Sequence, residues 1–159
     1  MRGVYRVLAF LVAAEVAVQA MFIVWGDAGM GLYVEDGGVI DKATFESAFE
    51  GGEAPFPEFV AFLYHGMNGM MVIPALALLL VISSFFAKVP RGVTFALAVL
   101  GLVVLQVTLG LMGHSVAILG AFHGINALLL FSTAMWTGLR VVRMTRAAHA
   151  ESRTERVPV

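Results

Sequence analysis

The 159-residue sequence contains no cysteine, which excludes a disulfide framework, thiolate metal sites, iron–sulfur clusters and covalent c-type haem attachment. Charged residues are also scarce, at 13% of the chain, whereas soluble domains carry about a quarter. The formal net charge of -1 leaves no global basic field that would attract a nucleic acid. Hydrophobic residues make up 60% of the chain. This composition excludes a disordered chain and an ordinary soluble enzyme, and it indicates a protein whose solvent is lipid.

Four apolar stretches are long enough, at about 20 residues or more, to cross a bilayer as helices. They lie at about residues 4–25, 59–86, 93–113 and 119–141. We therefore predict an all-α integral membrane protein, an up-down-up-down four-helix bundle in a single domain over residues 1–145, followed by a polar cytoplasmic tail over 146–159. Pro74 lies inside the second span and predicts a tilt or a kink there.

Basic and acidic residues lie on opposite sides of the predicted spans. Nine of the ten Lys and Arg residues fall on the side of the two chain ends, and Lys42 is the exception. The long segment 26–58, between the first and second spans, carries eight acidic residues. By the positive-inside rule, we expect a bacterial-type inner membrane protein with both termini in the cytoplasm and segment 26–58 on the outer face.

A short helix is predicted within this outer loop. Asp41 fits the N-cap position of a helix over residues 42–50, and Phe45, Ala48 and Phe49 fall on one of its faces. Glycines and prolines follow and end the helix before the second span. The helix either rests on the bundle or forms a lid over an outward-facing site.

Two polar motifs occur twice in the same order. Residues 64–69 read Tyr-His-Gly-Met-Asn-Gly at the start of the second span, and residues 122–127 read Phe-His-Gly-Ile-Asn-Ala at the start of the fourth. Upstream, in the first and third spans, a glutamine is followed seven residues later by a glycine: Gln19 and Gly26, Gln106 and Gly113. This duplication predicts two helical hairpins related by a pseudo-twofold axis along the membrane normal, as in parallel repeats.

The predicted symmetry places His65 and His123 at matching depths near the outer face, on spans that lie diagonally across a four-helix core. Two imidazoles that face each other across such a core form the ligand pair of a six-coordinate haem. A ligating histidine usually donates its second ring N–H to an oxygen, and on a helix the carbonyls four residues back belong to Ala61 and Leu119. The other residues expected to line the cofactor at this level are Asn68, Asn126, Gln19, Gln106, Gly69 and Ala127.

Other interpretations of these residues stay open. His114, at the outer end of the third span, could pair with a haem propionate, lie at the membrane interface, or join His65 and His123 in a copper or zinc site. The polar residues could also serve helix contacts in an accessory or assembly subunit of a membrane complex. Because polar residues within spans are costly and are functional candidates by default, a haem protein that transfers electrons to or from a protein or a quinone is the leading hypothesis.

Paired histidines on the second and fourth helices of a four-helix unit resemble one half of the heme A synthase family, and also small four-span bacterial membrane proteins with a histidine near the start of the same spans. The resemblance covers nearly all of residues 4–141 in architecture, and in motif it rests on His65, His123 and the two glutamines. It implies a b-type haem held by the two histidines.

This chain departs from the heme A synthase pattern at a catalytic position. The family's catalytic half carries a glutamate three residues before its span-two histidine, where this chain has Phe62, and the equivalent position before His123 is Gly120. The family's outer-loop cysteine pair is absent too. The resemblance therefore implies a non-catalytic unit that holds haem, and not one that oxidises it.

Overall fold

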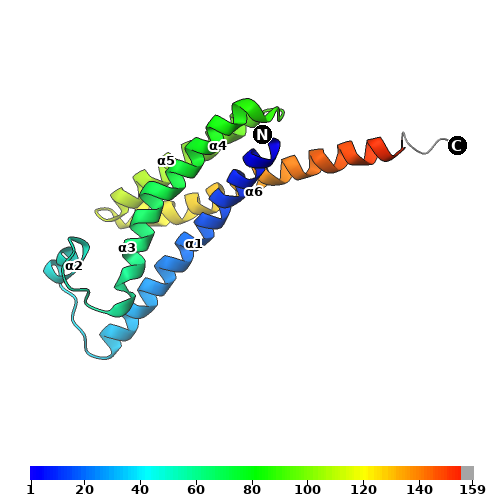
Figure 1. Cartoon of the computed structure of the whole chain (residues 1–159). Helices are drawn as coiled ribbons and strands as arrows, with labels where there is room; N and C mark the ends of the chain where they lie inside the picture. The colour runs from blue at the N-terminus through cyan, green and yellow to red at the C-terminus, as the bar shows by residue number, and fades with distance from the viewer. Residues whose placement is uncertain (155–159) are drawn as a thin grey trace. The chain divides into compact units, whose positions relative to one another are not determined.

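The computed structural model describes residues 1–154, with the side chains of residues 1–152, and all regular structure in this part of the chain is helical (Figure 1). The elements are α1 (Arg2–Glu35), α2 (Lys42–Phe49), η1 (Pro57–Phe59), α3 (Val60–Met67), the π-helical turn η2 (Asn68–Val72), α4 (Ile73–Ala87), α5 (Gly92–Gly113) and α6 (Ala117–Thr154). Four helices in the described chain are long and apolar enough to cross a membrane, namely Arg2–Glu35, Pro57–Ala87, Gly92–Gly113 and Ala117–Ser152. The chain is thus an all-α, multi-pass membrane protein in contact with lipid.

Two of these helices are longer than the sequence predicts. The first ends at Glu35 and not near residue 25, so residues 26–35 of the predicted outer loop are helical. Gly37, with φ of 89°, ends the helix: its N–H donates to the carbonyl of Val34, and the next N–H donates to the carbonyl of Tyr33. This pair of bonds is the Schellman motif, in which a left-handed glycine closes a helix. At the other end of the chain, α6 continues through the predicted polar tail to residue 154, and residues 155–159 of that tail lie outside the described residues.

The chain divides into two compact units. The first comprises Met1–Val16 and Ile73–Val159, and the second comprises Ala17–Val72. Both boundaries fall inside long helices, so neither a linker nor a change in composition marks them in the sequence.

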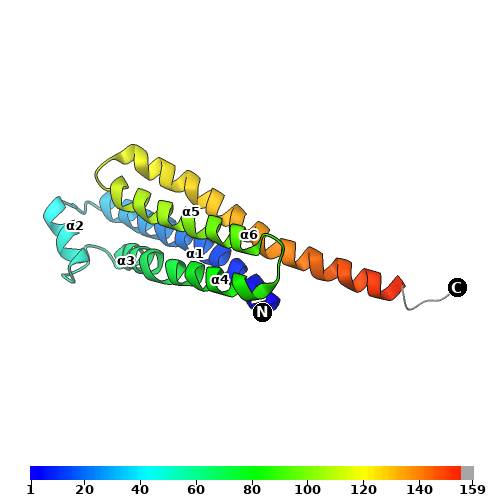
Figure 2. The same ribbon diagram turned by 90° about the horizontal axis from the view of Figure 1, so that it is seen from above.

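The core of the first unit is shared by the beginning of α1 and by α4, α5 and α6. Each segment buries a stripe of residues at steps of three or four, such as Tyr5, Ala9 and Val12 of α1, which is the spacing of one helical face. The hairpin neighbours α4 and α5, and likewise α5 and α6, lie antiparallel and side by side (Figure 2). Outside these stripes the helices expose large apolar side chains, among them Leu78 and Phe85, in a density that a lipid environment accommodates and water does not.

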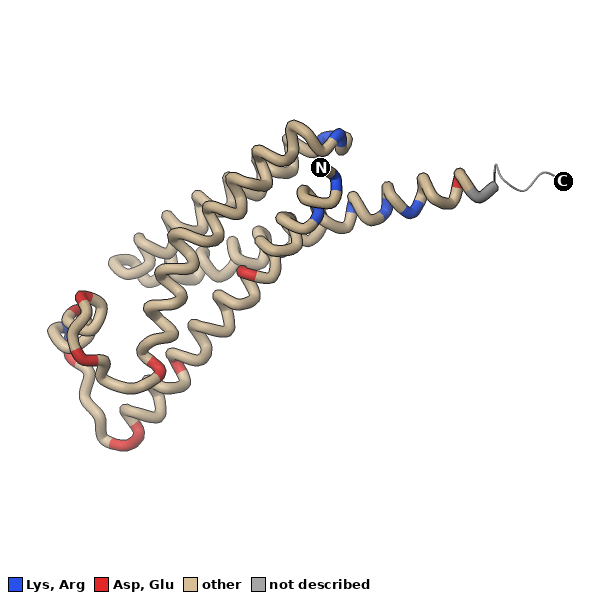
Figure 3. Tube along the Cα trace, in the orientation of Figure 1, with Lys and Arg blue, Asp and Glu red and all other residues tan. Residues whose placement is uncertain are grey.

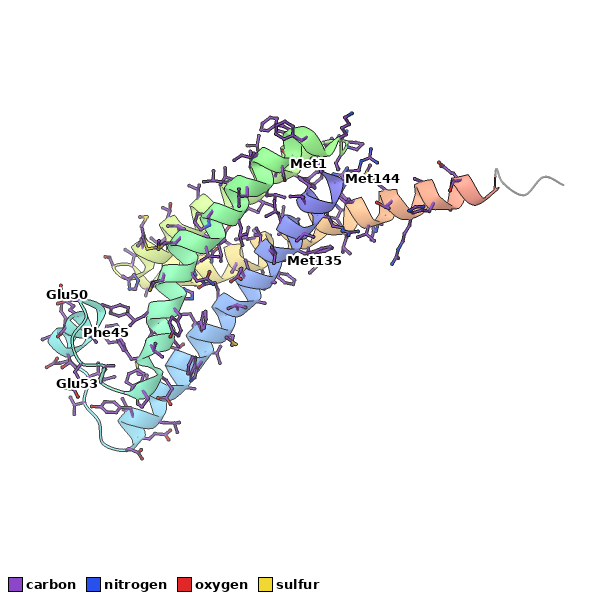
Figure 4. All side chains as sticks on the ribbon, viewed as in Figure 1. Met1, Phe45, Glu50, Glu53, Met135 and Met144 are labelled. Atoms are coloured by element: carbon purple, nitrogen blue, oxygen red, sulfur yellow. The ribbon has the colours of Figure 1, made fainter. Side chains whose placement is uncertain are left out.

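The core of the second unit is aromatic. Phe45 and Phe49 of α2 contact the fully buried Phe59 edge to face, with ring centroids 5.4 and 4.9 Å apart; Phe45 is labelled in Figure 4. Asp41 is the N-cap, and its carboxylate accepts a hydrogen bond from the Thr44 N–H at 2.8 Å. The predicted cap and the predicted apolar face of the loop helix are both confirmed, and that face rests on the start of the second span.

The second span contains one turn of π-helix, η2, directly before Pro74. Proline has no N–H, and its ring clashes with the carbonyl four residues back, here that of Met70. A π-turn widens the helix at that point and accommodates the ring. The predicted disturbance at Pro74 takes this form. The equivalent position in the fourth span is Ser132, and α6 remains a regular α-helix there.

Candidate functional site

In the second unit, the ring of His65 connects α3 to α1. Its Nδ1 lies 3.2 Å from the main-chain oxygen of Gln19. Because a carbonyl oxygen can only accept a hydrogen bond, this contact requires the proton on Nδ1, and the other ring nitrogen, Nε2, is then the one that can ligate a metal. The side chain is half-buried.

In the first unit, His123 of α6 makes the same contact with α5. Its Nδ1 lies 2.9 Å from the main-chain oxygen of Gln106. Gly110, one turn further along α5, makes room for the ring, because a Cβ at this position would lie 3.1 Å from Cε1 and Nδ1 of His123. Each histidine is therefore oriented by the main chain of the glutamine that the sequence repeat pairs with it.

The carbonyls four residues back from each histidine, those of Ala61 and Leu119, are not the acceptors of Nδ1, and that expectation is wrong. The carbonyl four residues back points along the axis of the histidine's own helix, whereas the side chain projects sideways from that axis, so the ring does not meet this carbonyl. A ring that projects sideways from the helix instead reaches the main chain of the neighbouring helix, provided that the two helices approach closely.

The glycine of each repeat explains the close approach. A Cβ on Gly26 would lie 2.8 Å from the ring of Phe62, and a Cβ on Gly113 would lie 3.2 Å from the main chain of Gly120. Phe62 and Gly120 each stand three residues before the histidine of their hairpin. The glutamine and the glycine of the repeated motif thus contact the same two positions of the partner helix in both hairpins, so the two hairpins share one register.

The two hairpins differ in how they pair the glutamine side chain. In the first unit, the buried Nδ2 of Asn126 donates to Gln106 Oε1 at 2.7 Å and to the carbonyl of Leu102 at 3.0 Å. In the second unit, Gln19 is only 8% exposed, yet neither Oε1 nor Nε2 of its amide has a hydrogen-bond partner in the described part of the chain. This amide lies against Gly69 of η2, where a Cβ would be 3.6 Å from Nε2.

The π-turn is a second difference between the hairpins, at the same level of the helix. It begins at Asn68, the residue that the repeat aligns with Asn126, whereas α6 is regular around Asn126. A buried amide without a hydrogen bond costs about 1–3 kcal/mol. Asn126 Oδ1 also lacks a hydrogen-bond partner within residues 1–154. A bound molecule that hydrogen-bonds to this oxygen or to the Gln19 amide would offset the cost of burying it.

The remaining predicted residues lie in simpler surroundings. His114 is the exposed C-cap of α5, and Ala127 is half-buried against the core of the first unit. No three His, Asp or Glu side chains come together as a metal-binding group in the described chain.

Comparison with known proteins adds no further constraint. No family model matches the chain, and neither a curated protein nor a solved structure matches it. The interpretation of the site depends on the geometry of the two hairpins themselves.

Proposed function

We propose that this multi-pass membrane protein binds b-type haem through His65 and His123 and serves in electron transfer. The proposal is carried by one observation: main-chain oxygens orient both imidazoles in the same way. Nδ1 of His65 lies 3.2 Å from the oxygen of Gln19, and Nδ1 of His123 lies 2.9 Å from the oxygen of Gln106. Histidines that ligate a metal almost always donate the other ring N–H in this way, because the bond fixes the tautomer and raises the basicity of the ligating nitrogen. Both histidines thus have the tautomer that ligation through Nε2 requires.

A haem fits the donor set of this chain. The porphyrin supplies four of the six ligands, so two imidazoles complete the coordination without a group of three protein ligands. When bound, the haem supplies a one-electron couple whose potential depends on the axial ligands and their hydrogen bonds. The chain's own residues hold the imidazoles through the main-chain oxygens of Gln19 and Gln106, and Gly110 leaves room for the ring of His123. The buried amide of Gln19 would be available to a polar group of the ligand.

We propose for this protein the membrane topology that the sequence predicts. The two hairpins form an up-down-up-down bundle as parallel repeats, in an inner membrane, with the termini and nine of the ten basic residues on the cytoplasmic side. The bound haem would exchange its electron with a redox protein or a quinone. The resemblance to one half of the heme A synthase family supports the same ligand pair.

The test is a reduced-minus-oxidised absorption spectrum of the chain, expressed with supplementary haem and purified in detergent. We expect a b-type spectrum that weakens in His65→Ala and in His123→Ala and is lost in the double variant. His114→Ala and His149→Ala are the matched controls, because both side chains are exposed, and they should retain the full spectrum. Absence of the spectrum from the parent chain, or its persistence in the double variant, would contradict the proposal.

A second candidate function is that of an accessory or assembly subunit. The hydrogen bonds of Asn126 with Gln106 and Leu102 favour it, because they join α5 to α6 without any ligand. In that case a partner protein co-purifies with the parent chain and with the double histidine variant alike, and neither preparation shows a haem spectrum.

A further inference from the structure

Positive charge gathers at the turn between α4 and α5. Lys88 and Arg91 lie in the turn, and two more guanidinium groups are hydrogen-bonded to its carbonyls: Arg2 Nη2 to the oxygen of Lys88 at 3.3 Å, and Arg140 Nη2 to the oxygen of Pro90 at 3.2 Å. We call Arg2, Lys88, Arg91 and Arg140 the basic turn. All four belong to the first unit, and Figure 3 shows the basic residues of that unit around this turn and along the end of α6.

Among residues 1–154, no ion pair joins a carboxylate to the basic turn. Glu15 and Glu151 are the acidic residues of the first unit up to residue 154. The side-chain nitrogens of Lys88 and Arg91 have neither a hydrogen bond nor an ion pair in the described chain. Within the described chain, the basic turn therefore has no carboxylate as its counter-ion.

The backbone of the turn adds a second observation. Lys88 and Arg91 have φ of 51° and 55°, a left-handed conformation that favours glycine and asparagine over long side chains. The turn is nevertheless well anchored, since the Tyr5 hydroxyl donates to the carbonyl of Gly92 at 2.9 Å and the Arg140 guanidinium lies 4.1 Å from the Phe95 ring centroid. The N-terminus of α5, which begins here, has no side-chain cap, so its N–H groups add to the positive potential.

We propose that the basic turn binds the phosphate headgroup of an anionic phospholipid. Only residues 88–91 separate two helices that are long enough to span the membrane, so the turn cannot extend far beyond the headgroup region. Exposed Phe85 and Phe86 directly precede it and suit the adjoining acyl chains. Clusters of Lys and Arg next to membrane-spanning helices attract anionic headgroups in this way.

The test is native mass spectrometry of the full chain in detergent with added short-chain phosphatidylglycerol, with phosphatidylcholine and inorganic phosphate as comparison probes. We expect phosphatidylglycerol to bind and to bind more weakly in the variant Lys88→Asn/Arg91→Asn, because asparagine tolerates the left-handed backbone. The expected loss is about 30-fold in affinity, which corresponds to about 2 kcal/mol for two cations. Circular dichroism verifies that the variant is folded.

Two further variants keep the test decisive. Arg143→Gln/Arg146→Gln removes the same amount of charge further along α6 and should change the affinity by less than about 3-fold. Lys88→Arg/Arg91→Lys preserves the charge of the turn and should retain binding. This charge-preserving variant can be measured even if the asparagine variant does not fold. Equal loss in the asparagine and glutamine variants, equal binding of phosphatidylcholine, or full competition by inorganic phosphate would each overturn the proposal.

Discussion

Leucine at Gln19 and leucine at Gln106 should change the stability of the protein in opposite directions. The two residues occupy the same position of the repeat, and each holds a histidine ring through its main-chain carbonyl, which the substitution retains. Their side chains differ, because the amide of Gln106 is hydrogen-bonded and that of Gln19 is not, within the described chain. The comparison thus isolates the contribution of the buried amide.

The magnitudes follow from these partners. Gln106→Leu removes the 2.7 Å bond from Asn126 Nδ2. Interhelical hydrogen bonds in membrane proteins contribute about 0.6 kcal/mol on average and about 1.7 at most, so we expect a loss of about 1 kcal/mol. Gln19 is 8% exposed, and Gln19→Leu removes two buried polar atoms that make no hydrogen bond in the described chain. Relief of their desolvation cost should stabilise the haem-free protein by about 1–3 kcal/mol.

The assay is reversible unfolding of the haem-free protein in mixed micelles, followed by circular dichroism as the fraction of denaturing detergent rises. The matched control is Gln106→Leu/Asn126→Leu, which removes the acceptor and the donor of that bond together, and its loss of stability should be smaller than the sum of the losses in the two single variants. If Gln19→Leu destabilises the protein as much as Gln106→Leu, the amide of Gln19 is satisfied in solution, and the reasoning from its burial is refuted.

Three further substitutions test the contact with His123, the π-turn of the second span and the cap of the loop helix α2. Gly110→Ala places a Cβ 3.1 Å from the His123 ring and should weaken the haem spectrum, whereas Gly101→Ala, which has nothing within 4 Å of its Cβ, should leave it unchanged; equal spectra in the two variants would show that the ring is not held closely. Pro74→Ser supplies the missing N–H and should convert η2 to a regular α-helix, which appears as a newly protected amide at residue 74 in hydrogen exchange by NMR; an unprotected amide there would mean that proline does not cause the π-turn. The pKa of Asp41 is held below its ordinary value by the N–H groups that it caps, so its contribution to α2 is complete above the ordinary pKa of about 3.9 and is lost as the pH falls through the lowered pKa. The protection of the α2 amides, measured relative to their intrinsic exchange rate at each pH, should therefore fall in acid for the parent chain but not for Asp41→Asn, which caps without titrating. The same fall in both would contradict this assignment.

The sequence predicted the features that depend on local pattern. Composition and run length located the four spanning helices, and the Asp41 cap with its apolar face located α2. The repeat also placed each glutamine at the level of the histidine in its own hairpin, where the structure has them in contact. These features are encoded within a few turns of one helix, where spacing determines which residues share a face.

The remaining features depend on how neighbouring helices approach each other. Residues 26–35 read as loop because of their glycines and acidic residues, yet the contact of Gly26 with Phe62 shows that a glycine there serves helix packing. The acceptors of the two imidazoles lie on the adjacent helix for the same reason. Gly110 was missed, although its position one turn after Gln106 is a signal that could have been read, because glycine within a spanning helix often marks a close contact.

The two hairpins act as an internal comparison for one another. They share the glutamine, the glycine and the histidine contacts, but only the first has a proline nine residues after its histidine. The proline accounts for the π-turn, the π-turn begins at the asparagine of the motif, and the glutamine of that hairpin is the one whose amide lacks a partner in the described chain. Helix packing alone does not require a π-turn beside an amide without a hydrogen bond. In the other hairpin the regular helix lets Asn126 donate a hydrogen bond to the amide of Gln106. The buried amide costs about 1–3 kcal/mol, and under the proposed function a polar group of the bound haem would offset this cost by hydrogen-bonding to it.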